Sequence, residues 1–175
     1  MQMNNKNIVL IGMPGSGKTT FSKKIQNHFL SKYEIKDTDV LIEEKENKTI
    51  NEIFEEFGES YFRKLESELV ESVSKENMKI ISTGGGVILN PQNMKFLQNN
   101  GIIIFIDRPL HKIIEDFKGD NRPLVRNKIE KLETLYKERI ELYKQYSDYI
   151  INNENTVEDF MLELEKILKK ENIEL

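Results

Sequence analysis

The segment GMPGSGKTT, residues 12–20, follows the apolar run NIVLI and constrains this chain more than any other feature. It matches the pattern G-x-x-x-x-G-K-[ST], in which a glycine-rich turn joins a strand to a helix. The glycines let backbone N–H groups converge on phosphate oxygens, and the positive end of the following helix favours the same anion. Lys18 adds a charge at the β- and γ-phosphates, and Thr19 offers a hydroxyl to Mg²⁺. We therefore expect this loop to bind a nucleoside triphosphate with Mg²⁺.

Short β-branched runs alternate with longer stretches of helical periodicity along the whole chain. This alternation is typical of βα units around a parallel sheet, which places the chain in the α/β class. Its 175 residues fit one domain, so we expect a single P-loop domain over residues 1–175. Strands are expected at residues 7–11, 34–36, 79–82, 102–106 and 149–151. Helices are expected at residues 18–30, 39–46, 50–57, 60–74, 92–99, 109–117, 128–146 and 157–171.

The composition argues against several classes of protein. A net charge of −4 and a pI of about 5.4 disfavour a nucleic-acid partner, which normally requires a basic face. No apolar run approaches the ~18 residues that a membrane span needs, and the N-terminal run is too short for a secretory signal. The absence of cysteine excludes disulfides, thiolate zinc sites and cysteine nucleophiles. We expect a cytoplasmic protein.

The segment KDTDVLIEE places Asp37 and Asp39 where the second strand ends and a helix begins. Residues two apart on an extended segment share a face, so the two carboxylates can lie in one site and have different roles. One would lie towards the Mg²⁺ shell, and the other would accept a hydrogen bond or proton from an attacking hydroxyl. The simpler alternative is that Asp39 only caps the helix.

Three consecutive glycines, Gly84 to Gly86, follow another predicted strand, where they would let a ligand approach the backbone. A tight turn is the alternative reading. Only five of the 26 basic residues are arginine, so a retained arginine favours recognition of carboxylate or phosphate over solubility. Arg63, Arg122 and Arg139 stand in FRKLESE, NRPL and KERIELY, and each could equally be an ordinary ion-pair residue. The polar segment KGDNRPLVRN around Arg122 is a candidate mobile loop or a surface turn.

Taken in order, GMPGSGKTT, DTDVLIEE, INEIFEEFGESYFRKLESE, STGGG, NRPLV and ERIELY resemble the shikimate kinase family. That resemblance implies transfer of the γ-phosphoryl group of ATP to the 3-hydroxyl of shikimate, in the biosynthesis of aromatic amino acids. It implies a three-layer P-loop fold with a five-stranded parallel sheet of order 2-3-1-4-5, flanked by helices. It also implies a lid over about residues 115–128 that closes on the substrates. We expect a monomer whose partners are shikimate and ATP, with Mg²⁺ as cofactor and without nucleic acid or membrane.

The resemblance also implies roles for matching residues. Lys18, Asp39 and Arg122 would be catalytic, and Thr19 would hold Mg²⁺ with Asp37 nearby through water. The residues that would bind ATP are Gly15, Ser16, Gly17, Lys18, Thr19, Thr20 and Arg122. The residues that would bind shikimate are Asp39, Arg63, Gly84, Gly85, Gly86 and Arg139.

One part of the chain departs from the family pattern. Family members usually carry a further arginine before the lid, along the adenine, whereas IEDFKGDNRP has Asp116 and Phe117 there. Phe117 or Lys118 would have to take the place of that arginine beside the adenine. Two other readings stay open: another small P-loop kinase, such as a gluconate kinase or an adenylate kinase relative, or a non-catalytic nucleotide-binding protein. DTD lacks the histidine typical of gluconate kinases, no DGFPR-like motif is present, and the retained Lys18 speaks against loss of catalysis.

Overall fold

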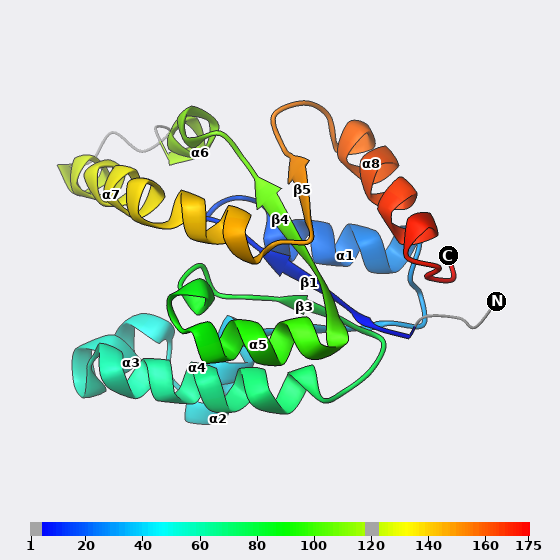
Figure 1. Ribbon diagram of the computed structural model, residues 1–175. Helices are drawn as coiled ribbons and strands as arrows, with labels where there is room; N and C mark the ends of the chain where they lie inside the picture. Colours follow the sequence, from blue (N-terminus) through cyan, green and yellow to red (C-terminus); the bar gives the residue numbers. More distant parts are fainter. Residues whose placement is uncertain (1–4, 118–122) are drawn as a thin grey trace.

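The structure is a computed structural model that describes residues 5–117 and 123–175, with the backbone alone for residues 117 and 123–128. Five parallel strands form one sheet in the order β2-β3-β1-β4-β5 (Figure 1). Ile8 of β1 pairs with Ile80 of β3 on one side and with Ile102 of β4 on the other. The strands are β1 (Asn7–Ile11), β2 (Glu34–Asp37), β3 (Lys79–Ser82), β4 (Gly101–Asp107) and β5 (Tyr149–Asn152). The predicted strand order is therefore confirmed.

Helices cover both faces of the sheet, because alternate strand residues are buried on opposite sides. Ile8 and Leu10 pack against α1 (Lys18–His28) and α8 (Val157–Lys170). Val9 and Ile11 lie on the opposite face and belong to an apolar cluster with side chains of four helices, which are α4 (Glu59–Ser74), α5 (Pro91–Asn100), α6 (Leu110–Phe117) and α7 (Pro123–Tyr146). Figure 1 shows α4 and α5 on the side of the sheet opposite to α1 and α8. The predicted three-layer α/β architecture is confirmed.

A smaller apolar cluster lies outside the main layers. Ile42 of α2 (Thr38–Glu46) and Ile53 of α3 (Ile50–Phe57) pack there with Phe62 of α4. Thr49 and Glu52 form a reciprocal capping box at the start of α3. The short 3₁₀ helix η1 (Val87–Leu89) follows the glycine triplet. No helix among the described residues is long and apolar enough to cross a membrane.

Several helix boundaries differ from the expectation by one or two residues and the start of α7 by five, and two of these differences have a clear local cause. Helix α2 begins at Thr38, because Asp37 is its N-cap and accepts hydrogen bonds from the N–H groups of Asp39 and Val40. The alternative in which Asp39 is the cap is therefore wrong. Helix α7 begins at Pro123 rather than at residue 128, since a proline is readily accommodated in the first helical turn, where its missing N–H has no partner to lose.

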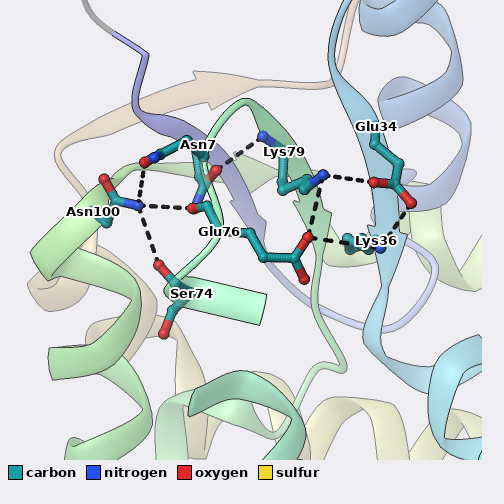
Figure 2. A network of polar contacts seen from close by, with 8 residues as sticks. Asn7, Glu34, Lys36, Ser74, Glu76, Lys79 and Asn100 are labelled. Atoms are coloured by element: carbon teal, nitrogen blue, oxygen red, sulfur yellow. Dashed lines mark hydrogen bonds and ion pairs between the residues drawn. The ribbon is translucent and has the colours of Figure 1, made fainter. Parts of the chain in front are cut away.

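A polar network joins the amino ends of β1, β2 and β3 (Figure 2). The phosphate-binding motif follows the carboxyl end of β1, so the network lies at the opposite edge of the sheet. The buried Asn7 side chain donates to the Glu76 carbonyl and accepts from the Lys79 N–H. Lys79 Nζ lies 2.6 Å from Glu34 Oε2, and Lys36 Nζ lies 2.7 Å from Glu34 Oε1. This network ties β1, β2 and β3 together, so we assign it a structural role.

The network predicts a pH-dependent contribution to stability. Hydrogen bonds from Lys36 and Lys79 lower the pKa of Glu34 from 4.5 to about 2. Because the folded pKa is depressed, the contribution is present above pH 4.5 and is lost as the pH falls towards 2. Glu34→Gln should lower the free energy of unfolding at pH 7 by less than about 1 kcal/mol, since the pair is exposed to solvent. Urea denaturation at pH 7 and at pH 3 checks this, and an equal difference at both pH values would contradict it.

Candidate functional site

The phosphate-binding loop lies between β1 and α1 at the carboxyl edge of the sheet. Gly17 is the N-cap of α1 with φ 101°, a left-handed conformation that favours glycine. A Cβ at Gly17 would also lie 3.2 Å from the Phe21 ring and 3.3 Å from Asn153 Nδ2. The Asn153 side chain donates to the Ser16 carbonyl at 2.9 Å, which anchors the loop to the end of β5. Asn153 carries no local motif that would have predicted this contact.

Lys18 lies buried beneath the loop. Its Nζ donates to the carbonyls of Gly12 and Met13, each at 2.8 Å. Burial lowers the pKa of Lys18 from 10.5 to about 8, although the carboxylates of Asp39 and Asp37 oppose this change. The ammonium group is therefore held at the loop but is weakly solvated, and a phosphate would supply a better partner than the carbonyls.

This pKa predicts that nucleotide affinity depends on pH. Bound phosphates favour the charged form of Lys18, so ADP binding above pH 8 must be accompanied by proton uptake at this group. We expect the Kd for MgADP to rise by up to about tenfold per pH unit above that value. Calorimetry at pH 7 and 9, in two buffers of different ionisation enthalpy, measures both the affinity and the proton uptake. An unchanged Kd would contradict the prediction.

Thr19 and Asp37 lie together at the mouth of the loop. Thr19 Oγ1 donates to Asp37 Oδ2 at 2.8 Å, and the other Asp37 oxygen caps α2. Hydroxyl and carboxylate oxygens are the donors that Mg²⁺ prefers, and Mg²⁺ needs few of them because it retains waters and phosphate oxygens. No cluster of three or more acidic or histidine ligands occurs within residues 5–117 and 123–175. The oxygens present therefore fit Mg²⁺ held mainly by a nucleotide.

One cavity of about 570 Å³ joins the loop to the paired aspartates. Asp39 lies in its lining and is partly buried. Burial and the neighbouring Asp37 raise its pKa, while Lys18 lowers it. A carboxylate with a raised pKa accepts a proton more readily at neutral pH. The predicted site residues in this lining are Gly15, Gly17, Lys18, Thr19, Thr20, Asp37, Asp39 and Gly85. Ser16 is buried behind it, and no hydrogen-bond partner is found for its Oγ among the described residues.

The glycine triplet follows β3 and allows charged side chains to approach closely. A Cβ at Gly84 would lie 2.7 Å from Asp39 Oδ1 and 3.2 Å from Glu66 Oε1. A Cβ at Gly86 would lie 2.5 Å from the Arg63 guanidinium. The Gly84 N–H donates to Thr38 Oγ1 at 3.0 Å, so this amide is engaged within the protein. Glycine is therefore needed at positions 84 and 86 because charged side chains pack against the backbone there, and the turn is not the only reason for the triplet.

Arg63 lies beside this triplet, Arg139 interacts with the nearby Glu66 and Tyr143, and neither arginine is in the lining of the cavity. Arg63 Nη1 donates to Glu66 Oε2 at 2.8 Å, and its Nε and Nη2 donate to Glu59. Arg139 interacts electrostatically with Glu66, and its buried Nε has no hydrogen-bond partner within the described part of the chain. The arrangement leaves donor capacity for an anion at this end of the site.

Two residues near the glycine triplet, Glu66 and Tyr143, were not predicted from the sequence. Glu66 is 1% exposed, and burial raises its pKa although Arg63 lowers it. Its position three residues after Arg63 on a helix was the available signal. Tyr143 donates its hydroxyl to the Gly85 carbonyl at 2.6 Å, and burial raises its pKa to about 12, so it remains a donor. No local motif indicated Tyr143.

Arg122 is the one predicted site residue outside the part of the chain that the structure describes. Residues 118–122 of the predicted lid, which spans residues 115–128, lie outside that part. The side chain of Phe117 and the whole of Lys118, expected to substitute near the adenine, also lie outside it. Asp116 is described, and it forms an ion pair with Arg108 in the lining of the same cavity.

Known proteins resemble this chain over almost its whole length. The family model described as Shikimate kinase matches residues 14–169. A shikimate kinase from Clostridium botulinum (strain Alaska E43 / Type E3) is 45% identical over 166 residues, covering 95% of this chain and 98% of the relative. One from Clostridium beijerinckii is 40% identical, covering 95% and 96%.

Solved structures agree with these relatives. The shikimate kinase from Acinetobacter baumannii in complex with shikimate superposes with a TM-score of 0.81 at 32% identity, covering 94% of this chain and 92% of that one. The enzyme from Aquifex aeolicus gives 0.78 at 32% identity, covering 93% and 96%. With the P-loop, the paired aspartates and the arginines beside the glycine triplet, these similarities show that the chain belongs to the shikimate kinase family.

Proposed function

We propose that this protein transfers the γ-phosphoryl group of ATP to the 3-hydroxyl of shikimate, giving 3-phosphoshikimate and ADP. We assign roles to named residues mainly because Lys18, Thr19 and Asp39 line the same cavity. Arg63 lies beside the same glycine triplet that Asp39 contacts, and Arg139 interacts with Glu66, the partner of Arg63. The phosphate-binding loop thus lies on the same cavity as the Asp39 carboxylate, and the arginines that would bind the acceptor lie close to that carboxylate.

Asp39 would orient the 3-hydroxyl of shikimate and accept its proton as the oxygen attacks. The new bond forms between that oxygen and the γ-phosphorus, while the bond from the γ-phosphorus to the bridging oxygen of ADP breaks. Lys18 would remain on the phosphates and stabilise the charge that develops on the leaving ADP. Mg²⁺ bound near Thr19 and Asp37 would neutralise charge on the β- and γ-phosphates.

Arg63 and Arg139 would bind the carboxylate of shikimate. Glu66, which is almost completely buried and paired with Arg63, would hold that guanidinium towards the substrate. A carboxylate arriving at the two arginines would satisfy donor groups that have no partner among the described residues, such as Arg139 Nε. The backbone of Gly85 and Gly86 would lie close to the ring of the substrate.

Arg122 and the lid are proposed from the sequence alone. The NRPLV motif within residues 115–128 would bring Arg122 onto the phosphates as the lid closes. Closure would exclude water from the transferring phosphoryl group. We further propose that the protein acts in the cytoplasm as a monomer, which sedimentation of the purified protein can test.

The proposed function is tested by ADP release from Mg-ATP with a panel of acceptors. Shikimate should give fast turnover, whereas quinate, gluconate and nucleoside monophosphates should give slow turnover or none. Faster release with gluconate would indicate the other small-molecule kinase reading. Tight ADP binding without turnover of any acceptor would indicate a non-catalytic nucleotide-binding protein.

Gly86→Ala should weaken shikimate binding without unfolding the protein. The new methyl group would overlap the Arg63 guanidinium, which is a movable side-chain end, so Arg63 should shift and the backbone should not. Misplacing one charge-assisted contact should raise the Kd for shikimate on the order of tenfold. Calorimetry with shikimate and with MgADP measures this, and the Kd for MgADP should be unchanged.

A second variant shows whether the effect passes through Arg63. Adding Gly86→Ala to an Arg63→Ala background should cause no further loss of shikimate affinity. A Kd for shikimate within twofold of the unmutated value in Gly86→Ala alone would contradict the prediction.

A further inference from the structure

Arg108 is a charged residue in the lining of the cavity, and the proposed function gives it no role. It follows β4 directly and lines the cavity together with Asp116, Asn153 and Val157. Among the described lining residues, Lys18 and Arg108 are the only ones with cationic side chains. Lys18 belongs to the phosphate loop, so Arg108 must serve a different part of the ligand or none.

The topology of the sheet indicates which part that is. The phosphate loop follows the central strand β1 in the order β2-β3-β1-β4-β5. Asp39 and the glycine triplet follow β2 and β3, so the acceptor end lies on one side of the loop. Arg108 and Asn153 follow β4 and β5, on the opposite side. With the γ-phosphate directed at the acceptor, the nucleoside end of the nucleotide must extend towards Arg108.

The guanidinium of Arg108 is held by hydrogen bonds from its two terminal nitrogens. Nη2 donates to Asp116 Oδ2 at 2.9 Å, and Nη1 donates to the Asn153 carbonyl at 3.5 Å. Its Nε is buried and has no hydrogen-bond partner among the residues that the structure describes. Hydrogen bonds to a guanidinium lie in its plane, so these contacts fix its orientation and leave its faces for stacking on a planar base.

Asn153 couples this group to the phosphate loop. Its side chain donates to the Ser16 carbonyl, while its own carbonyl accepts from Arg108. The position of the guanidinium is therefore set relative to the loop that holds the phosphates. Asp116 on α6 is 60% exposed in its side chain, and its contribution is to orient Arg108.

We propose that Arg108, oriented by Asp116, forms the wall of the nucleotide site against which the adenine ring of ATP stacks. The inference rests on the proposed function for the direction of the nucleotide. Arg108 then contributes to nucleotide affinity through the base, and Asp116 acts as a positioning residue.

The test compares a ligand that has a base with one that lacks it. MgADP and magnesium tripolyphosphate are titrated calorimetrically, without shikimate, into the unmutated protein, Arg108→Lys and Arg108→Ala. Both variants should raise the Kd for MgADP about tenfold, since lysine keeps the charge but lacks the planar face. The Kd for tripolyphosphate should change less than twofold. Lys112→Ala, a cation on the same helix as Asp116 but outside the cavity lining, is the control.

The outcomes separate the alternatives. An equal loss of tripolyphosphate and MgADP affinity would overturn the proposal and place Arg108 on the phosphates. No loss for either ligand would also overturn it and leave Arg108 as a structural ion-pair residue. Circular dichroism melting of each variant shows that the protein remains folded at the temperature of the titration.

A double-mutant cycle tests the role of Asp116. Asp116→Ala should weaken MgADP binding in the unmutated background and should have no effect in the Arg108→Ala background. Equal losses in both backgrounds would overturn the positioning role. Because these titrations contain no acceptor, a failure of shikimate turnover in the unmutated protein would refute the proposed function without altering their result.

Discussion

Lys18→Met is expected to reduce kcat for shikimate phosphorylation on the order of 100- to 1000-fold, because it removes a preorganised charge from the phosphates. Methionine has a similar length and no charge, so it fits a buried position. The Kd for MgADP should also rise. Steady-state ADP release and calorimetry measure the two effects.

The same change should leave thermal stability equal or slightly higher. Burial lowers the pKa of Lys18 to about 8 from 10.5, so the charged form is disfavoured in the folded protein. That cost is fully present below pH 8 and disappears as the pH rises towards 10.5. Methionine removes the cost together with the two hydrogen bonds to the Gly12 and Met13 carbonyls.

Lys23→Met is the matched control, since Lys23 is an exposed residue of the same helix. It should change neither kcat nor MgADP affinity. A Lys18→Met protein that keeps more than a tenth of the unmutated kcat would contradict the assignment. A large loss of stability would instead mean that Lys18 holds the loop together through its carbonyl contacts.

Asp39→Asn is expected to reduce kcat by about 100-fold or more, because asparagine retains the shape but cannot accept the proton of the hydroxyl. The raised pKa of the partly buried Asp39 carboxyl makes it a suitable acceptor. Phosphoryl transfer has a loose transition state, so part of the effect should appear as weaker shikimate binding. MgADP affinity should remain close to that of the unmutated protein.

Asp37→Asn is the comparison that separates the two carboxylates. Asparagine is also a good N-cap, so α2 should keep its cap and the melting temperature should hardly change. The Mg²⁺ concentration for half-maximal rate should rise, because the hydroxyl of Thr19 loses its carboxylate partner. Magnesium and shikimate titrations of both variants distinguish the roles. Unchanged kcat and KM in Asp39→Asn, with unchanged magnesium demand in Asp37→Asn, would contradict both assignments.

Much of the fold could be predicted because its signals are local. The β-branched runs gave strands within one residue of those observed, and α3 matches its expected bounds of residues 50–57. The P-loop pattern placed Lys18 and Thr19 correctly at the start of α1, since the glycine turn and the helix are adjacent in the chain. The start of α2 was missed by one residue, because a sequence with aspartates at positions 37 and 39 offers two possible caps.

The sequence by itself thus determined the α/β class, the phosphate loop and the family to which the chain belongs. Only the tertiary structure decided which distant side chains meet: Tyr143 with Gly85, Glu66 with Gly84, and Arg108 with Asp116 and Asn153. These contacts depend on the order in which crossover connections place the strands, and a local pattern carries no information about that order. In the sequence, Asp116 stands where family members usually carry an arginine. In the folded chain, Asp116 pairs with another arginine, Arg108, which directly follows β4.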